Sequence, residues 1–221
     1  MDIGRSFTYI TEDQEWVRKL LIGALITLIP VVGMFYAFGY MIEIIRNTIQ
    51  GREIPLPDPM EEFGGKIAKG LMMWVISFIY ALPIIVLVFC SQTGAVLPAV
   101  AQDMDVEILS IIMFSFMGCF GCLTLLYGIF MSLITPYAFA MYAESGQFGD
   151  AFKFAKIFDM LKKNLGPTFI ALLIIWLVSF VASLVGTIAC GIGLIFAIFY
   201  AQMVMGFLYG SLYKQARGTV Y

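Results

Sequence analysis

Few ionisable side chains in this 221-residue sequence lie where they could do chemistry. Glu43 lies inside a long apolar stretch, and a charge in such a place is expensive and often functional. Arg46 follows three residues later, which places both side chains on one face of a helix. We therefore expect a structural Glu43–Arg46 ion pair, with a role in an ion or solute pathway as the alternative.

The sequence lacks the residues that most enzyme mechanisms use. It contains no histidine, which excludes histidine metal sites, catalytic triads and histidine proton relays. It contains no P-loop, nucleophile elbow or zinc-protease motif. We predict a protein that is not an enzyme, with no catalytic residue, no cofactor and no metal site.

Two weaker patterns have simpler explanations. Cys119 and Cys122 form a C-x-x-C pair, but apolar neighbours disfavour the thiolate, so we interpret both as small buried hydrophobic residues. Asp103, Asp105 and Glu107 alternate and could attract a hard cation weakly. We expect them in a solvated loop instead.

The composition is that of a membrane protein. Hydrophobic residues make up 61% of the chain and charged residues 13%, against about 45–50% and about 25% in soluble domains. Residues 20–42, 70–102, 108–143 and 164–213 carry no charged side chain, and about 20 apolar residues suffice to cross a bilayer as a helix. The 13 basic and 15 acidic residues argue against a nucleic-acid partner.

We predict an all-α, polytopic helical membrane bundle with six helical segments in three hairpins, plus a basic amphipathic helix. Cationic residues gather before the first hairpin, in two loops and at the end of the chain, so the positive-inside rule places these regions in the cytoplasm. The expected segments are a cytoplasmic N-terminus 1–16, a short broken hairpin 17–49, a cytoplasmic loop 50–69, a hairpin 70–135 with an outer loop 91–107, a cytoplasmic amphipathic segment 136–166, a hairpin 167–213 and a cytoplasmic tail 214–221.

The first hairpin depends on Pro30 and Gly33. Cations on both sides of residues 17–49 indicate that both flanks lie in the cytoplasm, so this segment must cross the membrane an even number of times. Proline removes a backbone hydrogen-bond donor of a helix, and glycine can adopt φ values that other residues avoid. We predict that Pro30 and Gly33 form a hairpin tip between separate helices 17–29 and 32–49. The alternative is one kinked helix with the N-terminus outside.

Residues 148–164 form the expected amphipathic helix. Phe154, Phe158 and Leu161 share one face at 100° per residue, and the opposite face carries Lys153, Lys156 and Lys163. Such a helix lies at the membrane surface or packs on the cytoplasmic ends of the bundle. Both positions are compatible with the sequence.

Small residues recur at helix-packing spacing in the last span. They are Gly193, Ala197, Ala201, Gly206 and Gly210. Small-xxx-small faces let membrane helices approach closely. We expect packing within the bundle, with dimerisation as the alternative.

Several residues in the first half of the chain carry a family resemblance. They are Phe7–Thr8–Tyr9, Trp16, the run from Lys19 to Gly23, Ile29–Pro30, Gly39–Tyr40, Ile45–Arg46–Asn47, Leu56–Pro57, Phe63–Gly64 and Gly70, with Pro136, Gly146 and Ala151–Phe152 further on. In these residues the chain resembles the domain-of-unknown-function family four-zero-one-three of archaeal and bacterial multi-pass membrane proteins. Glu43 departs from that pattern. The resemblance implies a membrane protein and supplies no mechanism.

Two functions fit these observations. The first is a non-catalytic membrane scaffold or lipid-organising factor, with the lipid bilayer and a second copy or another membrane protein as partners. It accounts for the few polar groups inside the spans, the basic helix and the small-residue faces. The second is a small transporter or channel, because helices broken by proline and glycine build transporter sites.

Overall fold

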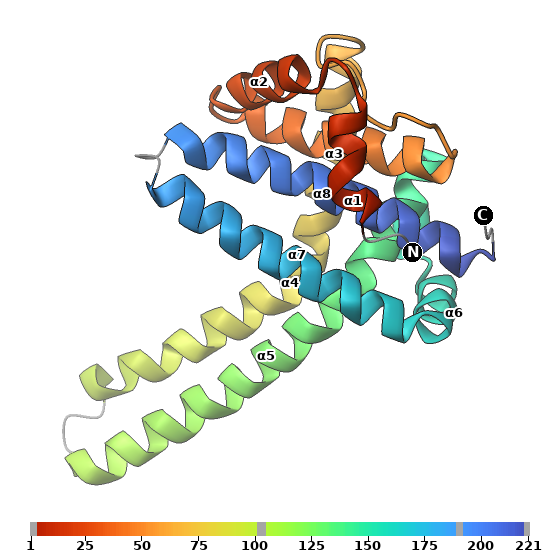
Figure 1. Cartoon of the computed structure of the whole chain (residues 1–221). Coiled ribbons are helices and arrows are strands. Elements are labelled where there is room, and N and C mark those ends of the chain that lie inside the picture. Colours follow the sequence, from red (N-terminus) through yellow and green to blue (C-terminus); the bar gives the residue numbers. More distant parts are fainter. Residues whose placement is uncertain (1–3, 101–104, 189–191, 219–221) are drawn as a thin grey trace. The chain divides into compact units, whose positions relative to one another are not determined.

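The chain folds into helices along most of its length (Figure 1). The structure is a computed structural model that describes residues 4–100, 105–188 and 192–218. The helices are α1 (Arg5–Glu12), α2 (Trp16–Thr27), α3 (Val32–Ile49), α4 (Phe63–Val100), α5 (Val106–Ser145), a 3₁₀ turn η1 (Phe148–Phe152), α6 (Phe154–Lys163), α7 (Leu165–Ile188) and α8 (Ile192–Ala216). The described residues contain no strand, so the all-α prediction is confirmed.

The chain divides into two compact units. The first comprises residues 1–76 and 133–221, and the second comprises residues 77–132. The second unit contains the C-terminal part of α4 and the N-terminal part of α5, and within it the Tyr127 hydroxyl donates to the Tyr80 carbonyl at 3.0 Å. The hairpin helices α7 and α8 contact each other within the first unit.

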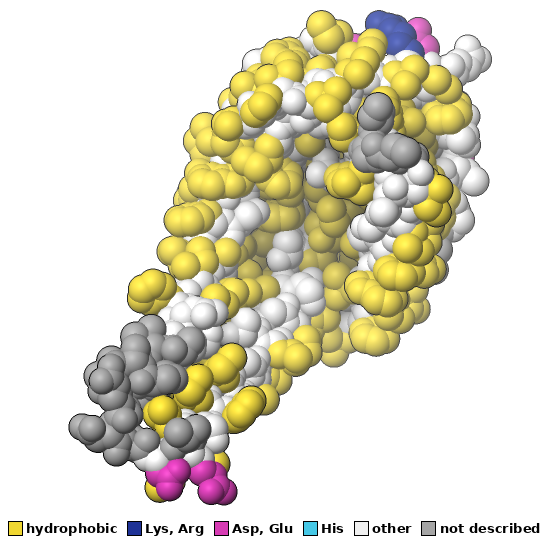
Figure 2. Space-filling model, turned by 90° about the vertical axis from the view of Figure 1, so that its left-hand side faces the viewer, with side chains coloured by type: hydrophobic (Ala, Val, Ile, Leu, Met, Phe, Trp, Pro, Cys, Tyr) yellow, Lys and Arg dark blue, Asp and Glu magenta, His cyan; other side chains and the backbone are white. Residues whose placement is uncertain are grey.

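Four helices are long and apolar enough to cross a membrane. They are Phe63–Gln92 of α4, Glu107–Ser145 of α5, Leu165–Ile188 of α7 and Gly193–Ala216 of α8. In α4, α5 and α7 many large hydrophobic side chains face outward, whereas α8 buries most of its own, and hydrophobic side chains spread widely over the face shown in Figure 2. Apolar side chains that face outward along helices of this length are compatible with contact to lipid tails and not with contact to water.

The chain has two separate helices on either side of Pro30, joined by a turn at Val31. α2 ends at Thr27, α3 begins at Val32, and α2 turns back over α3 (Figure 1). The turn is a γ-turn in which the Val32 N–H donates to the Pro30 carbonyl at 2.7 Å, with φ of 67° at Val31. Gly33 is required for space, because a Cβ there would lie 2.6 Å from the Ile26 carbonyl oxygen and the Thr27 Cα.

Helix α3 lies at the centre of the first unit. The side chains of Tyr36, Tyr40 and Ile44 in α3 are almost completely buried. α3 runs alongside α8, where a Cβ on Gly206 would lie 3.2 Å from Ile44 and one on Gly210 would lie 2.7 Å from Thr48. Gly206 and Gly210 therefore act as helix-packing residues inside this chain, as the small-residue spacing indicates.

The N-terminal segment 1–16 contains a helix that the sequence reading left as a polar tail. α1 buries Ser6, Tyr9 and Ile10 on one face. The Tyr9 hydroxyl donates to the Met203 carbonyl of α8 at 2.9 Å, and its ring stacks on Phe207 at 4.6 Å. The i, i+3, i+4 spacing of the buried residues was the available signal.

Two predicted boundaries are wrong because helices continue beyond them. The expected outer loop 91–107 is largely helical, since α4 extends to Val100 and α5 begins at Val106. Pro136, the expected end of a span, lies inside α5, which continues to Ser145. The side chains from Tyr137 to Ala143 are buried, and this packing outweighs the local cost of the proline.

The amphipathic segment packs on the bundle. α6 contacts α7 and α8, and its buried residues are Ile157, Met160 and Leu161. Phe154 is exposed, so the apolar face is rotated from the predicted one. The exposed side carries Lys153, Lys156 and Lys163.

Candidate functional site

The predicted Glu43–Arg46 ion pair is wrong. Glu43 pairs instead with two lysines of α4, at 3.1 Å from the Lys66 ammonium and 2.8 Å from the Lys69 ammonium. Lys69 also lies 3.3 Å from Glu62. The sequence reading considered the neighbour on the same helix, whereas the folded chain supplies lysines from the next one.

Lys66 is buried because α3 and α4 cross almost backbone to backbone. Its side chain is 1% exposed. A Cβ on Gly39 would lie 1.7 Å from the Lys66 carbonyl oxygen, and one on Gly70 would lie 1.7 Å from the Phe35 carbonyl oxygen. The Lys66 ammonium also donates to the Glu61 carbonyl. Glu43 and Glu62 together balance the two positive charges of Lys66 and Lys69 at this crossing.

The proline-rich residues 53–59 form a strap along α3. Three side chains of α3 donate to alternate carbonyls of the strap: Asn47 to Pro55 at 2.9 Å, Tyr40 to Pro57 at 3.0 Å and Tyr36 to Pro59 at 3.0 Å. An extended chain presents alternate carbonyls to one side, which explains the spacing of two. The strap is therefore a fixed part of the first unit.

Two ionic contacts hold the outer side of the strap. Lys19 pairs with Asp13 at 2.6 Å and donates to the Leu56 carbonyl at 3.3 Å. The Asp58 carboxylate accepts the backbone N–H groups of Met60 and Glu61 at 2.9 and 3.3 Å. The N–H of Met60 is the main reason that the pKa of Asp58 lies below its usual value of 3.8.

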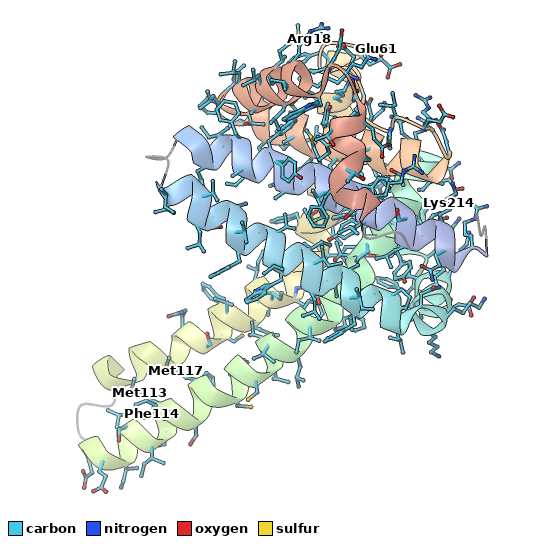
Figure 3. All side chains as sticks on the ribbon, viewed as in Figure 1. Arg18, Glu61, Met113, Phe114, Met117 and Lys214 are labelled. Carbon is cyan, nitrogen blue, oxygen red and sulfur yellow. The ribbon has the colours of Figure 1, made fainter. Side chains whose placement is uncertain are left out.

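A separate pocket lies where α3, α5 and α8 end. It has a volume of about 330 Å³ and is lined by Arg46, Ile49, Gln50, Glu144, Lys214 and Arg217. Arg46, separated from Glu43, faces this pocket and has no ion-pair partner among the described residues. Figure 3 labels Lys214, which extends from the last turns of α8. The sequence reading missed the pocket, because its residues come from three distant segments.

Hydrogen bonds connect side chains that line this pocket. The Tyr213 hydroxyl donates to the Glu144 carboxylate at 2.6 Å, and the other oxygen of that carboxylate accepts from Arg217. The Arg217 guanidinium lies 5.7 Å from the centre of the Tyr213 ring. Glu144 and Tyr213 therefore fix Arg217 in place.

The other candidate residues have surface or structural positions. Lys153 pairs with Asp150 at 2.5 Å and Lys163 with Asp159 at 2.7 Å. The hydrogen bond from Lys153 is the main reason that the pKa of Asp150 is lowered. Gly193, Ala197 and Ala201 are partly exposed on α8, so they are less enclosed than Gly206 and Gly210.

The cysteine interpretation needs correction. Cys119 and Cys122 are free thiols exposed on α5, not buried by protein. Within the described residues, no group of three Cys, Asp or Glu side chains is placed to hold a metal ion. Asp105 and Glu107 are exposed, as a solvated position requires, while Asp103 lies outside the described residues.

These observations define a class and a family. Four membrane-length apolar helices among the described residues are those of a helical membrane protein. The family model described as "Protein of unknown function (DUF4013)" matches residues 22–191. The chain belongs to this family. The comparisons with curated proteins and with solved structures gave no match.

The residues that carried the resemblance have clear structural roles. Gly39 and Gly70 allow the α3–α4 crossing. Tyr40 and Asn47 hold the strap through Pro57 and Pro55. These residues of the family pattern therefore belong to one part of the fold, namely α3, the strap and the start of α4.

Proposed function

We propose that this protein is a non-catalytic scaffold or lipid-organising factor of the plasma membrane, with its N- and C-termini in the cytoplasm. Its first partner is the lipid bilayer, and its second is another membrane protein or a second copy of the chain. Enzymatic activity and a nucleic-acid partner form no part of the proposal.

The observation that carries the proposal is the use of the charged groups around α3. Glu43 is 12% exposed and is shared by Lys66 and Lys69, while Lys19 pairs with Asp13 and donates to the Leu56 carbonyl of the strap. A transport pathway needs ionisable groups that meet solute or water. Here these groups meet one another, and they hold α3 and α4 together.

The second unit supports a role at lipid or protein surfaces. Its helices carry large apolar side chains outward, such as Phe114 at 77% and Met117 at 49% exposure on α5 (Figure 3). A Cβ on Gly118, Gly121 or Gly128 would meet no atom within 4 Å. This hairpin therefore offers apolar area to lipid or to a neighbouring helix.

The second candidate function, a small transporter or channel, is favoured by the broken α2–α3 hairpin. A flux assay separates the two. The full chain is reconstituted in liposomes and challenged with a panel of ions and small anions, beside protein-free liposomes and liposomes with Glu43→Gln. We expect equal flux in all three. Flux in the wild type above that of protein-free liposomes would favour the transporter and contradict the scaffold proposal.

A further inference from the structure

The pocket at the ends of α3, α5 and α8 has the charge of an anion site. Arg46, Lys214 and Arg217 bring three cationic groups, and among the described residues of the lining Glu144 is the one carboxylate. Both oxygens of Glu144 are already engaged, by Tyr213 and Arg217. The lining therefore keeps an excess of positive charge, with the Arg46 guanidinium free of any ion pair within the described chain.

The position of the pocket at the ends of the helices indicates which molecule would carry the anion. Glu144 lies at the end of the membrane-length segment of α5, and Lys214 near the end of that of α8. The ends of spanning helices lie at the level of the lipid headgroups, where long cationic side chains extend toward phosphate. Ile49 adds an apolar contact to the lining, which suits the glycerol end of a lipid.

The size and rigidity of the pocket fit a small ligand. Its volume of about 330 Å³ is at the lower end of the range of about 300–1,000 Å³ for ligand pockets. Arg217 is held by Glu144 and by the face of the Tyr213 ring. A fixed guanidinium presents paired N–H donors that match the oxygens of a phosphate group.

We propose that this pocket binds the phosphate group of an anionic phospholipid, with Arg46, Lys214 and Arg217 as its cationic ligands. The inference deepens the proposed lipid-organising function and rests on it for the source of the phosphate. The same chemistry would also accept free phosphate, and the experiment distinguishes the two sources.

The test measures binding to the purified full chain in detergent at low ionic strength. The probes are phosphatidylglycerol and phosphatidic acid, with zwitterionic phosphatidylcholine as the comparison without net charge, and inorganic phosphate and glycerol 3-phosphate as soluble arms. We expect the two anionic lipids to bind and to raise the unfolding temperature. Arg46→Gln and Lys214→Gln should each weaken lipid binding about tenfold or more, as expected for the loss of a charged hydrogen bond.

Two further variants separate the site from general charge and from misfolding. Arg18→Gln also removes one exposed cation, and Arg18 lies in a different part of the first unit from Lys214 (Figure 3). It should bind lipid as the wild type does. Arg46→Lys keeps the charge and should recover part of the affinity, which a purely structural effect of Arg46→Gln would not predict.

The outcomes are distinct. Binding of inorganic phosphate that displaces the lipid and depends on Arg46 supports the pocket and assigns free phosphate as the source. Equal binding by wild type and Arg46→Gln, or no binding of any phosphate probe, would overturn the proposal. Solute flux through liposomes would contradict the proposed scaffold function but not the phosphate pocket, because lipid binding that depends on Arg46 is measured in a separate experiment.

Discussion

At the scale of single residues, Glu43 shows how a local rule can identify the right group and the wrong partner. Its position in an apolar stretch correctly indicated a paired charge. The partner could not be read from helical spacing, because Lys66 and Lys69 reach Glu43 only after the strap returns the chain alongside α3. Pairing between segments depends on the loop path, which the sequence pattern does not contain.

Removal of the Glu43 charge should be costly. Glu43→Gln leaves the Lys66 ammonium, with a side chain 1% exposed, without its carboxylate. We expect a loss of about 3–5 kcal/mol in the free energy of unfolding, the usual result of breaking a buried pair. Denaturant unfolding of the full chain in detergent measures it.

The matched control for Glu43 is an exposed carboxylate. Glu15 pairs with Arg18 at 2.7 Å, but both side chains are more than half exposed. Glu15→Gln should therefore change the free energy of unfolding by less than about 1 kcal/mol. Equal effects of the two substitutions would mean that Glu43 is not part of a structural cluster.

Val31 offers a stabilising substitution in the α2–α3 turn. Its φ of 67° is unfavourable for a β-branched residue. Val31→Gly should relieve strain of about 1–3 kcal/mol and lose part of that gain through a more flexible unfolded chain. We expect a net rise of about 1 kcal/mol in the free energy of unfolding. An unchanged or lowered unfolding temperature would contradict this account of the turn.

At the scale of helices, the pattern of apolar and breaking residues located the three hairpins but not every boundary. The separate helices on either side of Pro30 followed from proline chemistry and charge parity, and the structure has them. Pro136 does not end its helix, because the burial of the residues that follow it outweighs the local cost of a proline inside a helix. Whether a proline ends a helix depends on tertiary packing, which no short window of sequence reports.

The crossing of α3 and α4 makes a sharp prediction for glycine. Gly39→Ala would place a Cβ 1.7 Å from the Lys66 carbonyl oxygen, so the two helices would have to separate. We expect a loss of about 3 kcal/mol or more in the free energy of unfolding, at or above the usual range for overpacking. Thermal unfolding in detergent, followed by circular dichroism, measures it.

Gly118 supplies the control on α5. A Cβ there meets no atom within 4 Å, so Gly118→Ala should be neutral or should stabilise the helix by about 0.5–1 kcal/mol. Destabilisation by both substitutions would indicate a general intolerance of added side-chain volume. A stable Gly39→Ala variant would contradict the close crossing.

At the scale of the whole molecule, the charges predict an orientation. Lys153 lies after α5, and Asp105 lies immediately before it. α5 is an uninterrupted helix whose apolar part can cross a membrane, so these two positions should lie on opposite sides. The positive-inside rule, applied to the cations around the second basic loop, predicts that Lys153 and Lys163 lie in the cytoplasm and Asp105 outside.

Cysteine labelling tests that orientation in intact cells. In a variant that lacks Cys90, Cys119, Cys122 and Cys190, single cysteines are introduced as Asp105→Cys and Lys153→Cys, both at exposed positions. A membrane-impermeant reagent added outside should label position 105 directly and position 153 only after the membrane is opened. Labelling of position 153 from outside would reverse the orientation. It would also place the cationic α6 on the outer surface, where the headgroup interactions of the proposed function would have to be with the outer leaflet.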